Sequence, residues 1–399
     1  MGAWAPLSAD EELGYVYVPL TAPTESYYGG HRPGNNLYAN SLVALDAKTG
    51  RLVWHFQMVH HDLWDYDNAS APTLGEVTVE GKRIKAVFQP NKSGFLFAFD
   101  RATGKPLWPI EEKPVPAGIL PGEAASPTQP FPSRPPAFDR QGITIDDLID
   151  FTPQLRADAE SFIKNYVTGP LFTPPSLKDD PVTGRKGTLQ MPGAWGSGNW
   201  NTNAFDPETG IFYAVSMSLP DVYALSKPKK EGRGTIAYEW NEDGERGGNA
   251  EVPSLYGPSP HKGIPLLKPP YGRITALDMN TGEKLWTVAN GDGPRNDPML
   301  KDLHLPPLGT LGRPVPLLTK TLLFVGEASD ALFGKAGVSG KAKFFVYDKK
   351  TGRTLWQTTL PAGTTGGPIS YQVHDRQYIL IPFGGKDSSG WMAMALKNK

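Results

Sequence analysis

One short segment of the chain carries an unusual density of groups that could transfer protons. The run His60-His61-Asp62-Leu63-Trp64-Asp65-Tyr66-Asp67 places three carboxylates, two imidazoles and two aromatic rings within eight residues. A carboxylate held beside aromatic rings is the usual arrangement of a general base whose pKa is shifted by its surroundings. Aspartates that cap turns and rings that pack between strands would give the same pattern, and composition does not decide between the two. No third metal ligand stands near the histidines at helical or hairpin spacing, so we expect both to be structural.

Two further segments could contact a ligand. Lys92 occupies the tip of an apolar hairpin, in Gln89-Pro90-Asn91-Lys92-Ser93-Gly94, where a lysine on its own is usually solvated. The run Gly193-Ala194-Trp195-Gly196-Ser197-Gly198-Asn199-Trp200-Asn201 combines glycines that let a ligand approach the backbone with indoles for stacking and amides for orientation. A glycine-rich strand with a docking Trp explains this second segment equally well.

The elements that must position these residues are marked by a repeated phrase, Asp-x-x-Thr-Gly-x-x-x-Trp. It occupies residues 46–54, 100–108, 278–286 and 348–356, and residues 206–210 keep its turn without the Trp. An Asp side chain can accept hydrogen bonds from N–H groups two residues on, and Gly supplies a positive φ, so we expect a tight hairpin turn at each copy. Each copy with a Trp follows an apolar strand, and recurring strand–turn–strand units are typical of β-propeller blades. The Trp then falls at the same place on every blade, where it can pack between neighbours.

Composition agrees with an all-β globular protein and excludes several functions. The 399 residues include 44 Gly and 40 Pro, a high content of turn-forming residues. A net charge of −1 indicates no nucleic-acid partner and no attraction to an anionic membrane surface. The lack of Cys removes disulfides, thiolate chemistry and any C-x-x-C-H haem attachment. No apolar run approaches the roughly 18 residues that span a bilayer, so we expect no transmembrane segment, and we expect no signal peptide after Met1.

We expect a single propeller domain over residues 1–399, interrupted by an insertion at about 109–190. The insertion begins rich in Pro, and its middle predicts one helix with Thr152 as the N-cap and Pro153 at the first helical position. A strand pattern already starts close to Met1. We therefore expect that the blades needed before it to close a ring are missing.

Several phrases together make the chain resemble the pyrroloquinoline-quinone-dependent (PQQ-dependent) alcohol and sugar dehydrogenases, the quinoproteins. They are VHHDLWDYD, NKSGFLFAFD and the run GPLFTPPS…GT…PGAWGSGNW, in addition to the turn–Trp repeats. The phrases WAPLSADEELGYVYVPL and YYGGHRPGNNLYANSLVALD make the branch with the membrane-bound glucose dehydrogenases the most similar one. The resemblance runs in order through nearly the whole chain.

The resemblance implies an eight-bladed propeller, incomplete here, that holds PQQ on its axis beside a Ca²⁺ ion. It implies oxidation of a sugar or another alcohol, with electrons passing on to a quinone or other acceptor, and a periplasmic location. In the family's pattern Asp65 matches the base that takes the hydroxyl proton, and Lys92 matches the residue at the quinone oxygens. The other matched positions are three for the cofactor and one near the metal: Asn199, Trp200, Trp4 and Thr24.

The chain also departs from the family's pattern. Ala22 stands where methanol- and ethanol-oxidising relatives use an Asn, and Lys386, in Gly384-Gly385-Lys386-Asp387, stands where glucose-oxidising relatives carry a His. The substrate therefore stays open between a polyol and an aldose. The alternative function is that of a non-catalytic propeller fragment that acts as a protein-binding scaffold. The joint presence of Asp65, Lys92 and the Asn199-Trp200 pair favours the enzyme.

Overall fold

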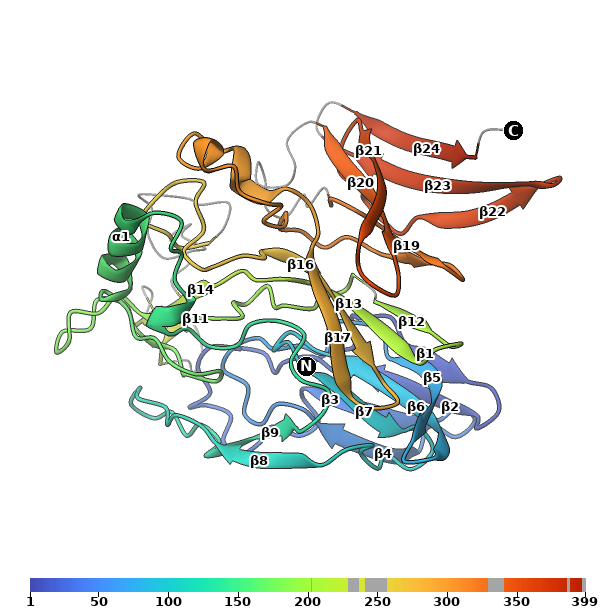
Figure 1. Cartoon of the computed structure of the whole chain (residues 1–399). Coiled ribbons are helices and arrows are strands. Elements are labelled where there is room, and N and C mark those ends of the chain that lie inside the picture. The colour runs from blue at the N-terminus through green and yellow to red at the C-terminus, as the bar shows by residue number, and fades with distance from the viewer. Residues whose placement is uncertain (202, 229–236, 241–256, 329–340, 386–387, 397–399) are drawn as a thin grey trace. The chain divides into compact units, whose positions relative to one another are not determined.

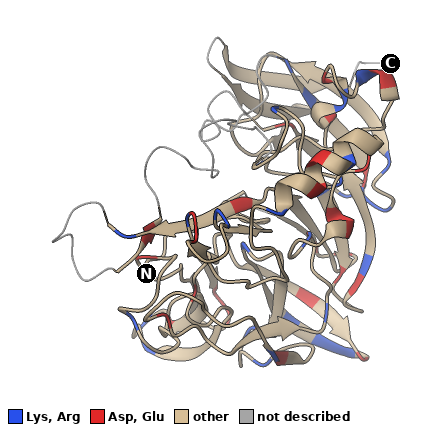
Figure 2. Ribbon diagram, turned by 90° about the vertical axis from the view of Figure 1, so that its left-hand side faces the viewer, with Lys and Arg blue, Asp and Glu red and all other residues tan. Residues whose placement is uncertain are grey.

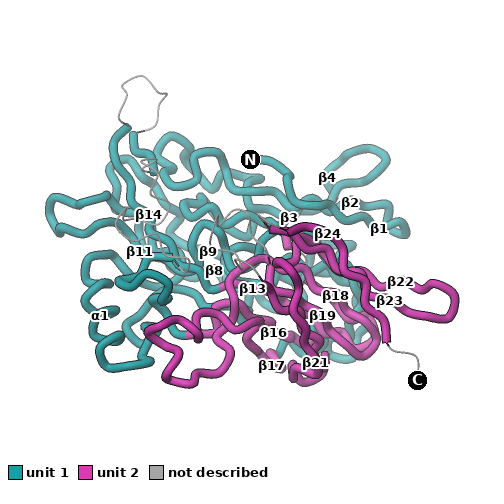
Figure 3. The backbone as a smooth tube through the Cα atoms, turned by 90° about the horizontal axis from the view of Figure 1, so that it is seen from above, with its two compact units in different colours: residues 1–200, 218–268, 279–283 teal, residues 201–217, 269–278, 284–399 magenta. Residues whose placement is uncertain are grey.

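Mostly antiparallel sheets are the main regular structure of the molecule (Figure 1). The computed structural model describes residues 1–399 apart from 202, 229–236, 241–256, 329–340, 386–387 and 397–399, so Lys386 lies outside the described residues. The chain divides into two compact units (Figure 3), unit 1 with residues 1–200, 218–268 and 279–283, and unit 2 with residues 201–217, 269–278 and 284–399. The all-β prediction is confirmed, and the single domain stays a prediction.

Unit 1 begins with two sheets whose strands pair in chain order. The first has four strands, β1 (Ser8–Asp10), β2 (Tyr15–Pro19), β3 (Ser41–Asp46) and β4 (Leu52–Gln57). The second has three, β5 (Thr73–Val79), β6 (Lys82–Pro90) and β7 (Leu96–Asp100). All neighbouring pairs are antiparallel, as expected for blades built from consecutive hairpins.

The rest of unit 1 holds the predicted insertion and shorter strands. One sheet pairs β8 (Ile110–Pro114) with β9 (Thr128–Pro132). In another, β14 (Asp221–Ser226) contacts β10 (Ser176–Leu177), β11 (Thr188–Gln190) and β15 (Glu239–Trp240). A 3₁₀ turn, η1 (Ile145–Asp147), lies between these two sheets in the sequence.

The predicted helix is confirmed as α1 (Pro153–Ile163) in unit 1. Thr152 caps it, because its side chain accepts the N–H of Leu155 at 3.1 Å, and Pro153 occupies the first turn. Leu155 and Ala159 form its buried face. Acidic and basic residues are interspersed along it (Figure 2), and they include an Arg156–Glu160 pair one turn apart. No helix among the described residues is long and apolar enough to cross a membrane.

The described residues of unit 2 form three antiparallel sheets. The first contains β12 (Ala204–Asp206), β13 (Ile211–Met217), β16 (Gly272–Asp278) and β17 (Glu283–Ala289). The second contains β18 (Leu317–Leu318), β19 (Leu322–Gly326), β20 (Ala342–Asp348) and β21 (Thr354–Leu360). The third contains β22 (Ile369–Val373), β23 (Arg376–Gly384) and β24 (Ser389–Ala395), and two 3₁₀ turns are η2 (Gly293–Asn296) and η3 (Lys301–Leu303).

The repeated phrase forms the turn that its residue types predict. Between β3 and β4, Oδ1 of Asp46 accepts the N–H groups of Lys48 at 3.1 Å and Thr49 at 2.7 Å, and Gly50 has a φ of 68°. The same bonds recur at Asp100 and Asp348. The turns are therefore local structures that the Asp and Gly positions determine.

Trp54 and Trp286 each pack on the turn of the next copy of the phrase, in line with the expected packing between neighbours. A Cβ atom on Gly104 would lie 2.6 Å from Cδ2 of Trp54, whose Nε1 donates to the carbonyl of Arg101 at 3.1 Å. In unit 2 the same contact joins Gly352 and Trp286, where the corresponding distance to Cδ2 is 3.0 Å. The small glycine thus serves two purposes, a positive φ and room for the indole.

Two further turns of this kind were not predicted from the sequence, one at Asp10, which accepts the N–H groups of Glu12 at 3.0 Å and Leu13 at 3.2 Å, and one at Asp180. Asp180, within the insertion, accepts the N–H groups of Val182 at 2.9 Å and Thr183 at 2.8 Å, and Gly184 has a φ of 67°. The sequence Asp180-Pro181-Val182-Thr183-Gly184 matches the turn half of the phrase.

Candidate active site

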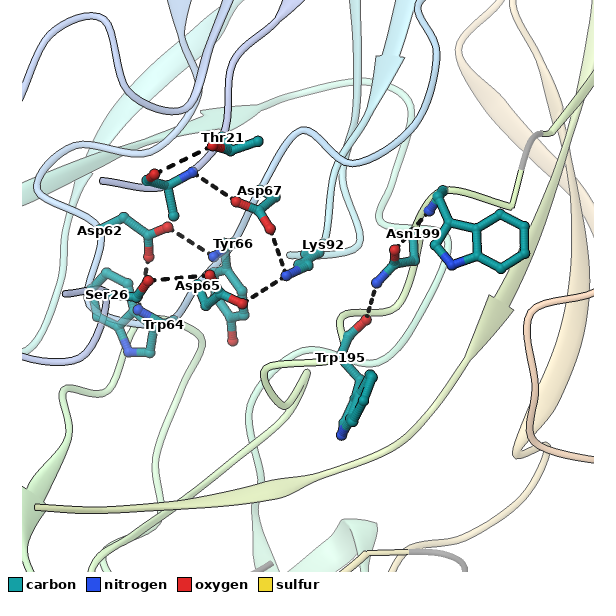
Figure 4. Close-up of polar contacts among 12 residues, drawn as sticks. Thr21, Ser26, Asp62, Trp64, Asp65, Tyr66, Asp67, Lys92, Trp195 and Asn199 are labelled. Carbon is teal, nitrogen blue, oxygen red and sulfur yellow. Dashed lines mark hydrogen bonds and ion pairs between the residues drawn. The ribbon is translucent and has the colours of Figure 1, made fainter. Parts of the chain in front are cut away.

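Three charged side chains of unit 1 meet in a group that we call the charge cluster: Asp65, Asp67 and Lys92. Nζ of Lys92 lies 2.8 Å from Oδ2 of Asp65 and 2.7 Å from Oδ2 of Asp67. Figure 4 shows the ammonium group pointing toward both carboxylates. The side chains of Lys92 and Asp67 are 5% and 6% exposed, whereas that of Asp65 is 27% exposed. Asp65 is therefore the member of the cluster that a molecule from solvent can reach.

The aspartate at the start of this loop has a different role from the other two. Oδ1 of Asp62 accepts the N–H of Trp64 at 2.7 Å, and Oδ2 accepts the N–H of Tyr66 and the Nδ2 of Asn40, both at 2.8 Å. Burial raises the pKa of Asp62 to about 6, even though these hydrogen bonds favour its charged form. The turn-capping interpretation is therefore correct for Asp62.

The two aromatic residues of the loop belong to the core. Trp64 and Tyr66 are almost fully buried and pack in one apolar cluster with residues such as Phe172. Nε1 of Trp64 donates to the carbonyl of Thr173 at 2.8 Å, and the hydroxyl of Tyr66 donates to that of Pro192 at 2.7 Å. These rings fix the loop on both sides of Asp65.

The backbone turns sharply at Asp65 itself. Its φ of 61° lies in the left-handed region, which costs a residue with a side chain about 1–2 kcal/mol. The hydroxyl of Ser26 donates to Oδ1 of Asp65 at 3.2 Å, while Oδ2 contacts Lys92. The structure therefore holds a strained residue at the one exposed carboxylate of the cluster, and such strain often accompanies functional sites.

Electrostatics make Asp65 a stronger base than a free aspartate. Burial and the neighbouring Asp67 raise the pKa of Asp65, against the lowering effect of the Lys92 ammonium. For Lys92, burial lowers the pKa, but the two carboxylates outweigh burial and raise it above its usual value. Lys92 is therefore a permanent cation beside a carboxylate that can take up a proton.

The connection between β6 and β7 carries Lys92 into the interior. Its N–H donates to the carbonyl of Asp67 at 3.1 Å, and its own carbonyl accepts the N–H of Ser197 at 2.9 Å. A Cβ atom on Gly196 would lie 2.3 Å from Cγ of Lys92, so bare backbone covers the lysine side chain. Lys92 is thus not solvated as a lone lysine at a hairpin tip usually is, and strand pairing alone does not reveal what packs over the tip.

The glycine-rich segment therefore lies against the charge cluster. Within it, Nδ2 of Asn199 donates to the carbonyl of Trp195 at 2.8 Å, and Oδ1 accepts the N–H of Trp200 at 2.7 Å (Figure 4). Asn199 is 3% exposed and Trp200 38% exposed. The amide of Asn199 thus shapes this segment, and the Trp200 ring keeps a surface that a ligand can contact.

The remaining two predicted site residues, Trp4 and Thr24, make no polar contact with the charge cluster in the described part of the structure. Trp4 is 51% exposed and Thr24 is also exposed. Among the described residues neither side chain bonds to Asp65, Asp67 or Lys92. Across all the residues that the structure describes, no group of three or more His, Asp or Glu side chains is placed to hold a metal ion.

The two histidines of the motif are structural, as expected. Nε2 of His61 lies 2.8 Å from Oε1 of Glu123, and both side chains are almost fully buried. Burial raises the pKa of Glu123, but the hydrogen bonds of His61 and of the Gly29 N–H outweigh burial and lower it. His60 contacts Gln57 and Glu112. The pair of His61 and Glu123 fastens the insertion to the site loop.

Sequence reasoning missed three residues of the site: Asp67 as a partner of Lys92, Ser26 and Glu123. Asp67 could have been found, because the phrase WDYD places a second carboxylate two residues after Asp65. Ser26 and Glu123 carry no local signal, because each reaches the loop from a distant part of the chain.

Comparison with known proteins gives a consistent result. The family model of the PQQ glucose/ethanol/alcohol dehydrogenase β-propeller domain matches residues 1–379. The quinoprotein glucose dehydrogenase of Escherichia coli K12 is 34% identical over 97% of this chain and 47% of its own length. The glycerol dehydrogenase large subunit of Gluconobacter thailandicus is 32% identical over 96% of this chain and 52% of its own length.

A solved structure supports the fold as well. The quinohemoprotein alcohol dehydrogenase from Comamonas testosteroni superimposes with a TM-score of 0.57 at 23% identity, over 96% of this chain and 44% of that chain. The chain thus spans about half the length of the relatives that it matches.

Proposed function

The chain belongs to the PQQ-dependent glucose/ethanol/alcohol dehydrogenase β-propeller family, and on this premise we propose that it provides the proton-abstracting site of a quinoprotein dehydrogenase. The observation that carries the proposal is the contact of 2.8 Å between the partly exposed carboxylate of Asp65 and the buried ammonium of Lys92. A carboxylate beside a fixed cation is what alcohol oxidation by hydride transfer requires of a protein.

The residues around Lys92 fit PQQ. The ammonium group is a hydrogen-bond donor that could face quinone oxygens. Gly196 has no side chain, so only backbone covers the lysine at this position. Trp200 offers a partly exposed indole for stacking on a planar ring. When bound, PQQ supplies an electrophilic carbonyl carbon that accepts a hydride.

Asp65 acts as the general base. Its pKa is raised, chiefly by burial, so in its ionised form it is a stronger base for the proton of a substrate hydroxyl group. Ser26 and Lys92 each hold one of its oxygens, which orients the carboxylate before the substrate arrives. Lys92 stabilises negative charge that builds up next to it, because it is buried and remains protonated.

The family resemblance extends the proposal to residues that lie beside the cluster or apart from it. We assign Asn199, Trp200 and Trp4 to cofactor binding, Asn199 through the segment that it shapes and the two Trp residues through their exposed rings. Ca²⁺ and its neighbour Thr24 rest on the resemblance alone. The described residues offer no complete set of metal ligands.

The substrate is a sugar or another alcohol, because relatives that match most of this chain are named for glucose and glycerol. Electrons then pass to a quinone or another acceptor, and the protein works in the periplasm, as in the family that it resembles. The buried charges favour the enzyme over the scaffold alternative. Two carboxylates and a lysine at one site are costly to bury, and packing alone would be served better by apolar side chains.

The decisive experiment combines cofactor binding with catalysis. Titration of the protein with PQQ and Ca²⁺ should quench tryptophan fluorescence with a stoichiometric end point. Dye-linked oxidation of glucose or glycerol should then fall by about 10²–10⁴-fold in Asp65→Asn, while PQQ still binds. Full activity in Asp65→Asn would overturn the assignment of the base, and failure to bind PQQ would leave only the scaffold.

A further inference from the structure

The two carboxylates that touch Lys92 are held very differently. Oδ1 of Asp67 accepts the N–H of Ala22 at 2.7 Å, and its backbone carbonyl accepts the N–H of Lys92. Its remaining oxygen, Oδ2, lies 2.7 Å from Nζ of Lys92, and the side chain is 6% exposed. Asp67 therefore has no oxygen left for a substrate, whereas Asp65 faces solvent.

This difference matters because the base must change its charge during the reaction. With both carboxylates ionised, the cluster carries one positive and two negative charges. When Asp65 takes up a proton, Asp67 still neutralises Lys92. Without Asp67, the same step would leave a buried ammonium without a counter-ion, which is strongly unfavourable.

We propose that Asp67 is the positioning residue of the site: it fixes the Lys92 ammonium and remains its counter-ion while Asp65 exchanges protons with the substrate. This inference rests on the proposed function of Asp65 and Lys92. Of the two aspartates in the phrase WDYD, Asp65 exchanges the proton and Asp67 holds the lysine in place.

Other titratable groups near the cluster do not supply this role. The carboxylate of Asp62 is engaged by N–H donors of its own loop and of Asn40. Asp221 accepts the N–H of Val222 on β14. Burial raises the pKa values of Tyr27 and Tyr223 well above 10, with the charge of Asp65 adding to the effect, so both phenols are neutral. Among the described residues, Asp67 is the carboxylate besides Asp65 that contacts Lys92.

The test uses Asp67→Asn and measures Asp65 directly. In protein labelled with ¹³C at the aspartate carboxyls, the Asp65 signal is assigned by its loss in Asp65→Asn and titrated without cofactor. We expect the Asp65 midpoint to fall by about 1 pH unit in Asp67→Asn, because a neighbouring negative charge is removed and Lys92 then pairs with Asp65 alone. Asp67→Glu keeps the charge and should restore the midpoint.

Kinetics of the PQQ-loaded protein give a second readout. The acidic limb of the kcat/KM profile should move to lower pH by the same amount in Asp67→Asn. At pH 7 kcat should fall about 10-fold while KM changes little, because a weaker base and a displaced lysine affect the chemical step. An unchanged Asp65 midpoint and an unchanged acidic limb in Asp67→Asn would overturn the proposal.

Unit 2 provides a matched control. Lys349 and Asp206 form a buried pair of 2.6 Å with side chains 5% and 4% exposed, like the pair of Lys92 and Asp67. Asp206→Asn should lower stability to a similar extent and leave the Asp65 midpoint where it is. A shift of the midpoint in this control would mean that general destabilisation, and not the position of Asp67, is responsible, and would contradict the proposal.

Two arrangements keep the test conclusive. If Asp67→Asn does not fold, the single variant Lys92→Met is compared with the double variant Lys92→Met/Asp67→Asn. Removal of both charges avoids an unpaired buried ion. The Asp65 midpoint must then be lower in the double variant than in Lys92→Met. The outcome is also separate from that of the proposed function. If the Asp65 midpoint does not shift in Asp67→Asn but Asp65→Asn is inactive, only the role of Asp67 is contradicted. If Asp65→Asn is active, the role of Asp65 as the base is contradicted.

Discussion

Nζ of Lys92 and Oδ2 of Asp65 lie 2.8 Å apart, although one belongs to the hairpin tip after β6 and the other to the loop after β4. Neither segment creates this contact alone. The aromatic residues Trp64 and Tyr66 fix the loop, and the glycine-rich segment covers the lysine. The candidate site is thus produced by packing between three segments of unit 1.

The first prediction concerns the pH dependence of activity. Asp65 must be ionised to act as a base, so kcat/KM should rise with pH through the pKa of Asp65 and be lost below it. Burial raises this pKa, so the acidic limb should lie above the ordinary aspartate range. Steady-state assays from pH 4 to 8 measure the limb. A profile that is flat over this range would exclude Asp65 as the base.

The second prediction concerns removal of the cation. Lys92→Met leaves Asp65 and Asp67 without their partner, so we expect a loss of about 3 kcal/mol in the free energy of unfolding. The pKa of Asp65 should rise further, because the ammonium that lowers it is gone. Urea denaturation measures the stability. Lys349→Met in the other buried pair is the control, and it should lower stability without affecting Asp65.

The third prediction concerns Asp62 and stability against pH. Its pKa is raised from 3.8 to about 6 in the folded protein, so ionisation of Asp62 is harder in the folded than in the unfolded state. This contribution to stability is therefore complete below about pH 4 and is lost as pH rises to about 6, by roughly 3 kcal/mol. Denaturant unfolding between pH 4 and 7 should show a smaller decrease with pH in Asp62→Asn than in the wild type. Equal slopes would contradict the buried state of this carboxyl.

The fourth prediction isolates the contact between the repeated turn and its Trp. Gly50 and Gly104 have almost the same φ, 68° and 71°, but a Cβ atom on Gly50 meets nothing, whereas one on Gly104 meets Trp54 at 2.6 Å. Gly50→Ala should therefore cost only about 1 kcal/mol for its backbone. Gly104→Ala should cost about 1–3 kcal/mol more, because the indole must move. Thermal or urea unfolding of the two variants measures the difference, and equal losses would mean that the Trp does not press on the turn.

The sequence predicted well those features that depend on residues close together in the chain. The turns at Asp46, Asp100 and Asp348 follow from an Asp and a Gly at fixed spacing, and α1 follows from Thr152 and Pro153. Such elements form from local hydrogen bonds, so their residue types suffice to recognise them.

Features that depend on contacts between distant segments of the chain were harder to predict from the sequence. Local reasoning placed Lys92 in solvent, because nothing in a hairpin reveals that Gly196 covers its tip. It left open whether the aspartates of the site loop cap turns or act as a base, whereas the hydrogen bonds and ion pairs distinguish Asp62 from Asp65 and Asp67. The family resemblance selected Asp65 and Lys92, and the structure then supplied the neighbours that give them their properties.

The left-handed backbone at Asp65 restricts how this position can evolve. Folding by itself would favour glycine there, or asparagine, because these residues adopt a positive φ most readily. Both would remove the acid, and an asparagine codon is one nucleotide change away. An aspartate in such a conformation is thus maintained at the expense of stability, so loss of selection on catalysis should first become visible in homologues as Gly or Asn at this one position.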